Sequence, residues 1–206
     1  MLPATSFQDA ARITIVSGLP RSGTSMMMQV LHAGGMEVMT DGLRAPDADN
    51  LRGYFELEAV KLLRSRPTEV RFESLGGKVV KILSHLVYNL PSRFGYRLIL
   101  MRRDLNEILA SQRVMLERNG KQVKEMDSKM FEIFSAEIER LKTWLATHPE
   151  IPVLEVSYNQ LLADGHTQIE AVNQFLGGRL DTTRMLQQVD RNLYRQRAQS
   201  QVTKIG

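Results

Sequence analysis

The stretch Gly18-Leu-Pro-Arg-Ser-Gly-Thr-Ser25 constrains this chain most, because it lies between an apolar run, Ile13–Val16, and a helix-like segment, Met26–Leu31. A strand, a tight glycine-containing loop and a helix form a phosphate cradle: backbone N–H groups converge on the loop, and the helix N-terminus adds a partial positive charge. The spacing is that of a P-loop, G-x-x-x-x-G-K-[ST]. One position departs from it: Thr24 stands where the lysine is expected, and Arg21 within the loop supplies the cation.

The composition is that of an ordinary globular protein. With 206 residues, 43% of them hydrophobic and 24% charged, the chain suits a single domain over 1–206, with a core at about 12–178 and a basic tail at about 184–206. The absence of cysteine excludes disulfides and a cysteine nucleophile, and it agrees with a cytoplasmic location. No apolar run approaches the roughly 20 residues of a membrane span. The N-terminus lacks the pattern of a signal peptide.

The net charge of +4 is a mild excess of 27 basic over 23 acidic residues. It suits an anionic ligand such as a nucleotide, but it is too small and too dispersed to indicate nucleic acid as a partner. The most basic stretch is terminal and contains Arg184, Arg191, Arg195, Arg197 and Lys204. A solvated helix face or a frayed tail is the simplest interpretation of that stretch.

Short apolar runs that do not alternate with polar residues indicate parallel strands covered on both faces. Four such runs occur, at 13–17, 79–83, 97–101 and 152–156. Between and after them, capping signals and apolar periodicity predict helices at about 104–120, 128–147 and 167–177. The polar region from about Gly34 to Gly77 is predicted to be a long connection with one helix near 57–65. The pattern predicts an α/β protein: one three-layer domain with a central parallel sheet flanked by helices.

The altered loop disfavours a nucleoside-triphosphate hydrolase. Such an enzyme needs the missing lysine on its phosphates and Mg²⁺ that is usually held by an acid at the end of a second strand. No apolar run ends in a clear aspartate of that kind. Cations stand at or near the strand ends instead, at Arg21, Lys81 and Arg103. This pattern suits a ligand whose charge is met by side chains, and no metal is expected.

Three segments resemble the sulfotransferases that use 3′-phosphoadenosine 5′-phosphosulfate (PAPS). Pro20-Arg-Ser-Gly-Thr-Ser25 is similar to the 5′-phosphosulfate loop of that family, approximately P-[KR]-[SA]-G-[TS]-[TS]. Arg103-Asp104, with Ser111 eight residues beyond the arginine, resembles its second signature. Val156–Leu161 and Gln174–Gly177 are a softer third match. The matches follow the order of the family and span roughly residues 13 to 177. Gly53-Tyr-Phe-Glu56 also resembles a segment of bacterial members of the family, so the chain resembles a bacterial-type member.

The resemblance implies the P-loop NTPase-like sulfotransferase fold and a reaction. A sulfuryl group would pass from PAPS to a hydroxyl or amine acceptor by in-line displacement without a metal. A small molecule, a carbohydrate, a lipid or a peptide all remain open as the acceptor, and the sequence does not specify the oligomeric state. Two alternatives remain: a P-loop nucleotide kinase or NTPase with a degenerate loop, and a non-catalytic nucleotide-binding protein on the same fold.

The resemblance also implies roles for single residues. Arg21 would stabilise the charge that grows on the bridging oxygen. The 5′-phosphate would contact the loop and the helix start, through Ser22, Gly23, Thr24 and Ser25. Arg103 and Ser111 would hold the 3′-phosphate. Tyr158 would contact adenine or is a core tyrosine.

The general base remains open between two residues. His85 follows Lys81 by four residues, whereas the cytosolic branch of the family has its histidine two residues after the lysine. Glu56 in Arg52-Gly-Tyr-Phe-Glu56 resembles the glutamate that follows the first helix in the carbohydrate and tyrosylprotein branches, and we favour it slightly. Lys81 would assist Arg21 at the bridging oxygen or would simply extend from a strand end.

Overall fold

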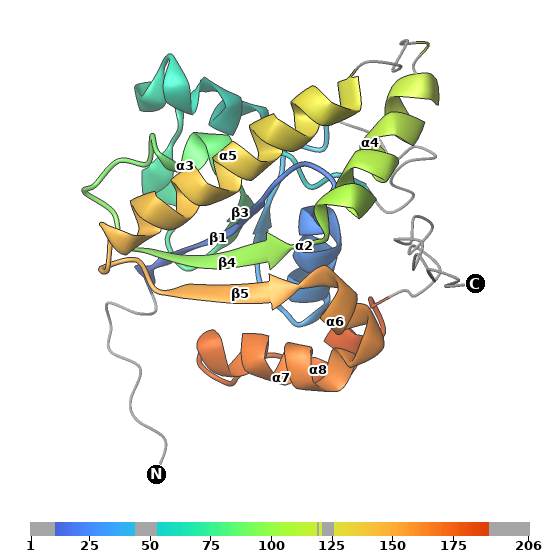
Figure 1. Cartoon of the computed structure of the whole chain (residues 1–206). Helices are drawn as coiled ribbons and strands as arrows, with labels where there is room; N and C mark the ends of the chain where they lie inside the picture. Colours follow the sequence, from blue (N-terminus) through green and yellow to red (C-terminus); the bar gives the residue numbers. More distant parts are fainter. Residues whose placement is uncertain (1–10, 44–52, 119, 121–125, 190–206) are drawn as a thin grey trace.

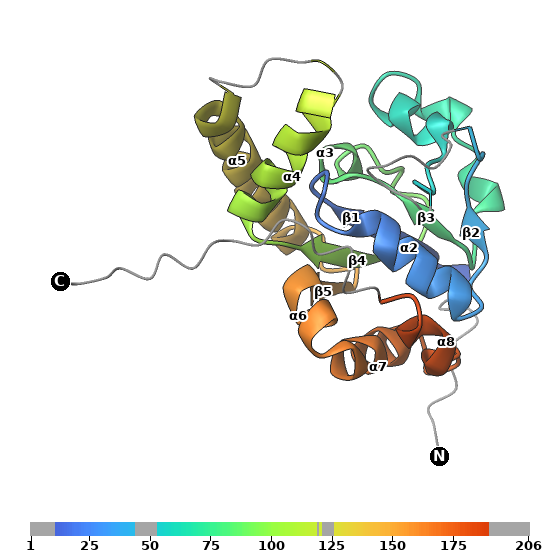
Figure 2. The same ribbon diagram turned by 90° about the vertical axis from the view of Figure 1, so that its right-hand side faces the viewer.

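The computed structural model describes residues 11–43, 53–118, 120 and 126–189. A five-stranded sheet with all its strand pairs parallel and the order β2-β3-β1-β4-β5 forms the centre of the molecule (Figures 1 and 2). The strands are β1 (Ile13–Gly18), β2 (Val38–Met39), β3 (Val79–Lys81), β4 (Tyr96–Arg102) and β5 (Val153–Ser157). The predicted α/β class with a parallel sheet is therefore confirmed, and the four predicted strands are present within a few residues of their expected bounds.

Helices cover both faces of this sheet (Figure 1). One face carries α3 (Ser84–Val87), α4 (Leu105–Arg118) and α5 (Met126–Ala146). The other carries α2 (Thr24–Ala33), α6 (Tyr158–Ala163), α7 (Gly165–Phe175) and α8 (Thr182–Leu186). All six residues of β1 are buried between these layers, which explains why its sequence reads as a continuous apolar run rather than an alternating one.

The connection between α2 and β3 is more structured than its polar sequence predicts. It contains β2, which was missed because two residues give no periodicity to detect, and three 3₁₀ helices at Glu58–Arg64, Pro67–Glu69 and Phe72–Ser74. Several of its apolar residues, among them Leu63 and Phe72, are fully buried against the sheet face that carries α3 and α5. The predicted helix near 57–65 is therefore a 3₁₀ helix.

Two details of the predicted helices are wrong. The helix predicted to begin at about residue 167 begins at Gly165 (α7), and Asp164 caps it by accepting a hydrogen bond from the Thr167 amide at 3.2 Å. On α5, Phe131 is 42% exposed although it shares the apolar periodicity with the buried Phe134. The α5 helix extends beyond the sheet at that end, and periodicity does not report where the neighbouring layer stops.

The folded part of the chain continues past Gly178. In α8, Met185 is fully buried among residues of α2 and α7, and the Asp181 amide donates to the Gly34 carbonyl at 3.1 Å. The start of the predicted basic tail is therefore part of the core, while Arg191, Arg195, Arg197 and Lys204 lie outside the described residues. None of the described helices is both long and apolar enough to cross a membrane.

At Gly18, the last residue of β1, the backbone lies very close to the following loop and to β4. Its φ is +150°, and a Cβ atom there would lie 2.5 Å from Ser22 Oγ and 2.7 Å from the Met101 carbonyl oxygen. Because that carbonyl belongs to the sheet and cannot move aside, Gly18→Ala should lower the free energy of unfolding by about 1–3 kcal/mol in a urea titration. Gly35→Ala is the matched control, since Gly35 also has a positive φ but a Cβ there would meet nothing within 4 Å. Equal losses for the two variants would contradict this explanation.

Candidate active site

The candidate site lies at the carboxyl edge of the sheet, where the strand order reverses. The chain leaves β1 for α2 and β2 on one side, and after β3 it crosses to β4 on the other side of β1. Since all these strands are parallel, their carboxyl ends meet at one edge, and the divergence of the connections opens a crevice for a ligand. The loop from Leu19 to Gly23 follows β1 at this edge (Figure 2).

Two left-handed residues shape this loop. Arg21 has a φ of 69°, and Gly23, the N-cap of α2, has a φ of 99°. A side chain at Gly23 would collide with Tyr158, because a Cβ atom would lie 2.4 Å from its ring. No side chain caps α2, so the amides of its first turn, at Thr24 and Ser25, remain directed at the place where a phosphate would lie. The Ser22 amide, predicted as a phosphate donor, instead donates to the Leu19 carbonyl at 3.2 Å.

The structure brings together three of the predicted site residues. Arg21 Nε donates to Ser111 Oγ at 3.0 Å, although these residues are 90 positions apart in the sequence. Arg103, just after β4, donates from Nη1 to the Arg21 carbonyl oxygen at 3.2 Å. The Arg21 side chain is thus bonded to Ser111 and its backbone to Arg103, so both arginines lie at the loop that precedes α2, an environment suited to phosphate.

Arg103 is held by residues that the sequence reasoning did not single out. Its side chain is 7% exposed, and its Nε lies 3.0 Å from Oε2 of Glu107, which is 2% exposed. Glu107 Oε1 accepts from Asn159 Nδ2 at 3.0 Å, and the guanidinium lies 4.5 Å from the centre of the Tyr158 ring. The spacing of four residues between Arg103 and Glu107 at the start of a helix is the pattern that could have indicated this ion pair from the sequence.

Tyr158 itself is 4% exposed and lies in the core beneath the loop. Its ring faces Gly23 on one side and Arg103 on another. Of its two predicted roles, this position favours the core tyrosine over the adenine contact.

The capping signal that predicts the helix at about 104–120 is present in the structure. Asp104 Oδ1 accepts hydrogen bonds from the amides of Asn106 and Glu107 at 2.9 and 3.2 Å.

Glu56 and Lys81 meet on the opposite side of the loop. Lys81 Nζ lies 3.4 Å from Glu56 Oε1 and donates to the Tyr54 carbonyl. Ser25 at the start of α2 donates to the same carbonyl at 3.4 Å, so the segment that carries Glu56 is tied to the phosphate loop. The φ of Phe55 is 50°, a strained value for a non-glycine residue that is typical of functional segments.

Lys61 is a second cation near Glu56. Its Nζ lies 3.6 Å from Glu56 Oε2. The hydrogen bond with Glu58, and then the charges of Glu58 and Glu56, raise the pKa of Lys61 despite partial burial. Lys61 is therefore cationic at neutral pH, and with Lys81 it places two cationic side chains beside the Glu56 carboxylate.

His85 lies on the exposed side of α3. Within the described part of the chain, no recorded hydrogen bond or ion pair joins it to Lys81, Glu56 or the loop. The neighbouring Ser84 points the other way and is buried. The structure therefore brings Glu56, and not His85, into the group of contacts around Lys81 and Ser25.

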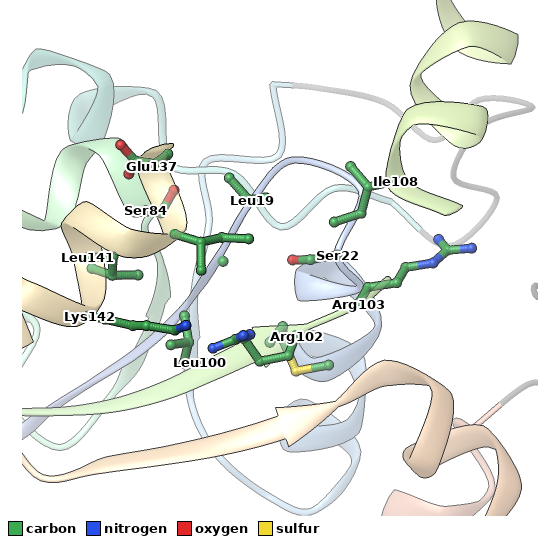
Figure 3. Close-up of a pocket in the computed structure, with 13 residues that line it drawn as sticks. Leu19, Ser22, Ser84, Leu100, Arg102, Arg103, Ile108, Glu137, Leu141 and Lys142 are labelled. Atoms are coloured by element: carbon green, nitrogen blue, oxygen red, sulfur yellow. The ribbon is translucent and has the colours of Figure 1, made fainter. Parts of the chain in front are cut away.

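A small cavity lies behind the loop, between the sheet and α5 (Figure 3). It measures about 20 Å³, which is room for about one water molecule. Leu19, Leu100 and Leu141 give it apolar walls, and the buried hydroxyls of Ser22 and Ser84 have no hydrogen-bond partner among the described residues. The Arg103 side chain extends away from it in Figure 3, whereas Arg102 and Lys142 line it.

The described residues contain no group of three or more His, Asp or Glu side chains placed to hold a metal ion. The convergent groups are instead two arginines on one side of the loop and the lysine–glutamate pair on the other. The first arrangement can bind an anion, and the second can accept a proton beside a cation.

Comparisons with known proteins agree with this geometry. The model of the family described as "Sulfotransferase family" matches residues 95–182, which include Arg103 and Ser111 but not the loop after β1. No curated protein matches the chain.

Two solved structures share the fold. The sulfotransferase domain from the curacin biosynthetic pathway has a TM-score of 0.54 and 13% identity, covering 87% of this chain and 78% of that one. The sulfotransferase domain from the Synechococcus PCC 7002 olefin synthase has a TM-score of 0.54 and 14% identity, and the match covers 96% of this chain and 92% of that one. The chain is therefore similar to the sulfotransferase family over residues 95–182, and it shares the α/β fold of two sulfotransferase domains.

Proposed function

We propose that this protein transfers the sulfuryl group of PAPS to a hydroxyl or amine acceptor, without a metal. The observation that carries the proposal is the convergence of Arg21, Arg103 and Ser111 beside the uncapped N-terminus of α2. A nucleotide with a phosphate on each side of its ribose matches this arrangement. The helix start suits the 5′-phosphosulfate, and Arg103 with Ser111 suits the 3′-phosphate.

Arg21 lies between these two subsites. Its Nε is bonded to Ser111 at 3.0 Å, so it reaches the bridging oxygen of the donor only by exchanging that bond for one to the donor. An arginine keeps its proton at any physiological pH, and its contribution is therefore electrostatic. It stabilises the charge that grows on the bridging oxygen more in the transition state than in the ground state.

The transfer is an in-line displacement at sulfur. The bond from sulfur to the acceptor oxygen or nitrogen forms while the bond from sulfur to the bridging oxygen breaks, and 3′,5′-phosphoadenosine leaves. The proton of the acceptor goes to a carboxylate, for which Glu56 is our choice. Lys81 lies 3.4 Å from that carboxylate, and its bond to the Tyr54 carbonyl holds the segment beside Ser25.

Glu56 is preferred to His85 because of its position. The Tyr54 carbonyl is bonded by both Lys81 and Ser25, so Glu56 lies two residues from an anchor at the start of α2. His85 is exposed on α3, with Ser84 and not the histidine turned toward the loop. A base has to reach the acceptor beside the sulfuryl group, and the contacts that tie the Glu56 segment to Ser25 support this choice.

The first test is nucleotide binding to the intact protein. We expect 3′,5′-phosphoadenosine to raise the melting temperature with EDTA present, because binding to the folded state at 100 times Kd adds about 2.7 kcal/mol of stability. Arg103→Ala should weaken the affinity by roughly 10- to 100-fold, since charge-assisted bonds to phosphate are lost.

Arg102→Ala is the matched control for that variant. Arg102 is the adjacent arginine, but its side chain is bonded to the exposed Glu155 at 3.3 Å. Among the described residues, no hydrogen bond or ion pair joins it to the loop after β1. A stabilising effect of Mg²⁺–ATP with none from phosphoadenosine would indicate a kinase or NTPase instead. Stabilisation by neither nucleotide would overturn the proposal.

The second test separates the two candidate bases. Glu56→Gln should lower the rate of sulfuryl transfer from labelled PAPS to a panel of phenols, saccharides and peptides by roughly 10²- to 10⁴-fold. The Kd for phosphoadenosine should remain unchanged, because the carboxylate is assigned to the acceptor. His85→Gln is the matched control and should retain the wild-type rate. The reverse outcome would assign the base to His85.

A further inference from the structure

The register of β4 and β5 determines which groups surround Arg103. Arg102 is paired with Ser157 in the parallel ladder, so the residues that follow, Arg103 and Tyr158, leave the sheet side by side. The first turns of α4 and α6 begin there, and Glu107 and Asn159 face each other across them at 3.0 Å. Arg103 therefore lies where a loop, two helix starts and a strand end meet.

Both carboxylate oxygens of Glu107 are used inside this junction. Oε2 accepts from Arg103 Nε at 3.0 Å, and Oε1 accepts from Asn159 Nδ2 at 3.0 Å. Glu107 is 2% exposed and Arg103 is 7% exposed at the side chain, so this contact is largely shielded from water. A carboxylate anchored at both oxygens cannot rotate freely, and it therefore fixes the plane of the guanidinium to which it is bonded.

Two further contacts restrict the same guanidinium. The Tyr158 ring lies 4.5 Å from it, and the Arg21 carbonyl accepts from its Nη1 at 3.2 Å. A flexible arginine loses side-chain entropy when it binds a phosphate, but here that entropy is already lost in the unliganded protein. Preorganisation of this kind strengthens binding without any new contact to the ligand.

We infer that Glu107, tethered by Asn159, is a positioning residue that orients Arg103 for the 3′-phosphate of the donor. The inference rests on the proposed function, because it assumes that Arg103 binds that phosphate. Glu107 does not touch the nucleotide. It acts through Arg103, and it thereby determines how strongly the protein prefers a 3′-phosphorylated nucleotide to one without that group.

The test compares two nucleotides by calorimetry, 3′,5′-phosphoadenosine and adenosine 5′-monophosphate, which lacks the 3′-phosphate. In Glu107→Ala the affinity for phosphoadenosine should fall roughly 10-fold, while that for the monophosphate changes by less than about 2-fold. Glu107→Gln keeps an oxygen that can accept from Arg103 and should restore most of the preference. Asn159→Ala loosens the tether and should reduce the preference by about 3-fold.

The direction in which the nucleotide affinity changes in Glu107→Ala distinguishes a positioning role from a simple effect of removing a negative charge. Removing an acidic group near a phosphate site strengthens anion binding by long-range electrostatics, whereas lost positioning weakens it. Glu155→Ala is the matched control, since it removes the carboxylate bonded to the neighbouring Arg102; it should leave the preference unchanged or raise it slightly. A purely structural Glu107 would lower the melting temperature with the preference intact.

Each outcome has a distinct meaning. An unchanged preference in Glu107→Ala, or an equal loss in Glu107→Ala and Glu107→Gln, would overturn the positioning role. If Glu107→Ala does not fold, Asn159→Ala decides, and an unchanged preference in that variant overturns the inference. A wild-type protein that binds both nucleotides equally would instead contradict the proposed 3′-phosphate site itself.

Discussion

The contact of Gly23 with the Tyr158 ring is the constraint on which the site depends. It joins the phosphate loop to the first turn of α6, and only a residue without a side chain allows so close an approach with a φ of 99°. The same ring supports Arg103 at 4.5 Å. The buried Tyr158 ring therefore fixes the position of Arg103 relative to the loop backbone. Gly23 is also the N-cap of α2, and because it has no side chain, it leaves the start of that helix without a side-chain cap.

The loop separates two kinds of electrostatic environment. On the β4 side, the Glu107 carboxylate is the one buried acidic group that accompanies Arg21 and Arg103 among the described residues. On the β3 side, Lys81 and Lys61 flank Glu56 at 3.4 and 3.6 Å. In the proposed reaction, donor binding and proton acceptance therefore lie on opposite sides of one short loop, and the two functions can be perturbed separately.

The sequence predicted the sheet and the loop because both depend on local patterns. Buried parallel strands are apolar throughout, and the spacing of Gly18 and Gly23 reflects backbone conformations that other residues rarely adopt. The two-residue β2 strand has no such pattern. The roles of Glu107 and Asn159 were also missed, because their contact joins positions 52 residues apart. It depends on the register between β4 and β5, which no local pattern reports.

The extent of the family match bears on where specificity resides. It covers residues 95–182, and therefore the Arg103 and Ser111 side of the loop, but it leaves out Glu56 and Lys81. The segment from β2 to β3, which carries Glu56, is built from 3₁₀ helices and a strained turn at Phe55 rather than from regular elements. Irregular segments on a rigid sheet can vary in shape without disturbing the core. If the donor is bound on the β4 side as proposed, the identity of the acceptor is encoded on the β3 side, and substitutions there should change the acceptor while leaving nucleotide affinity intact.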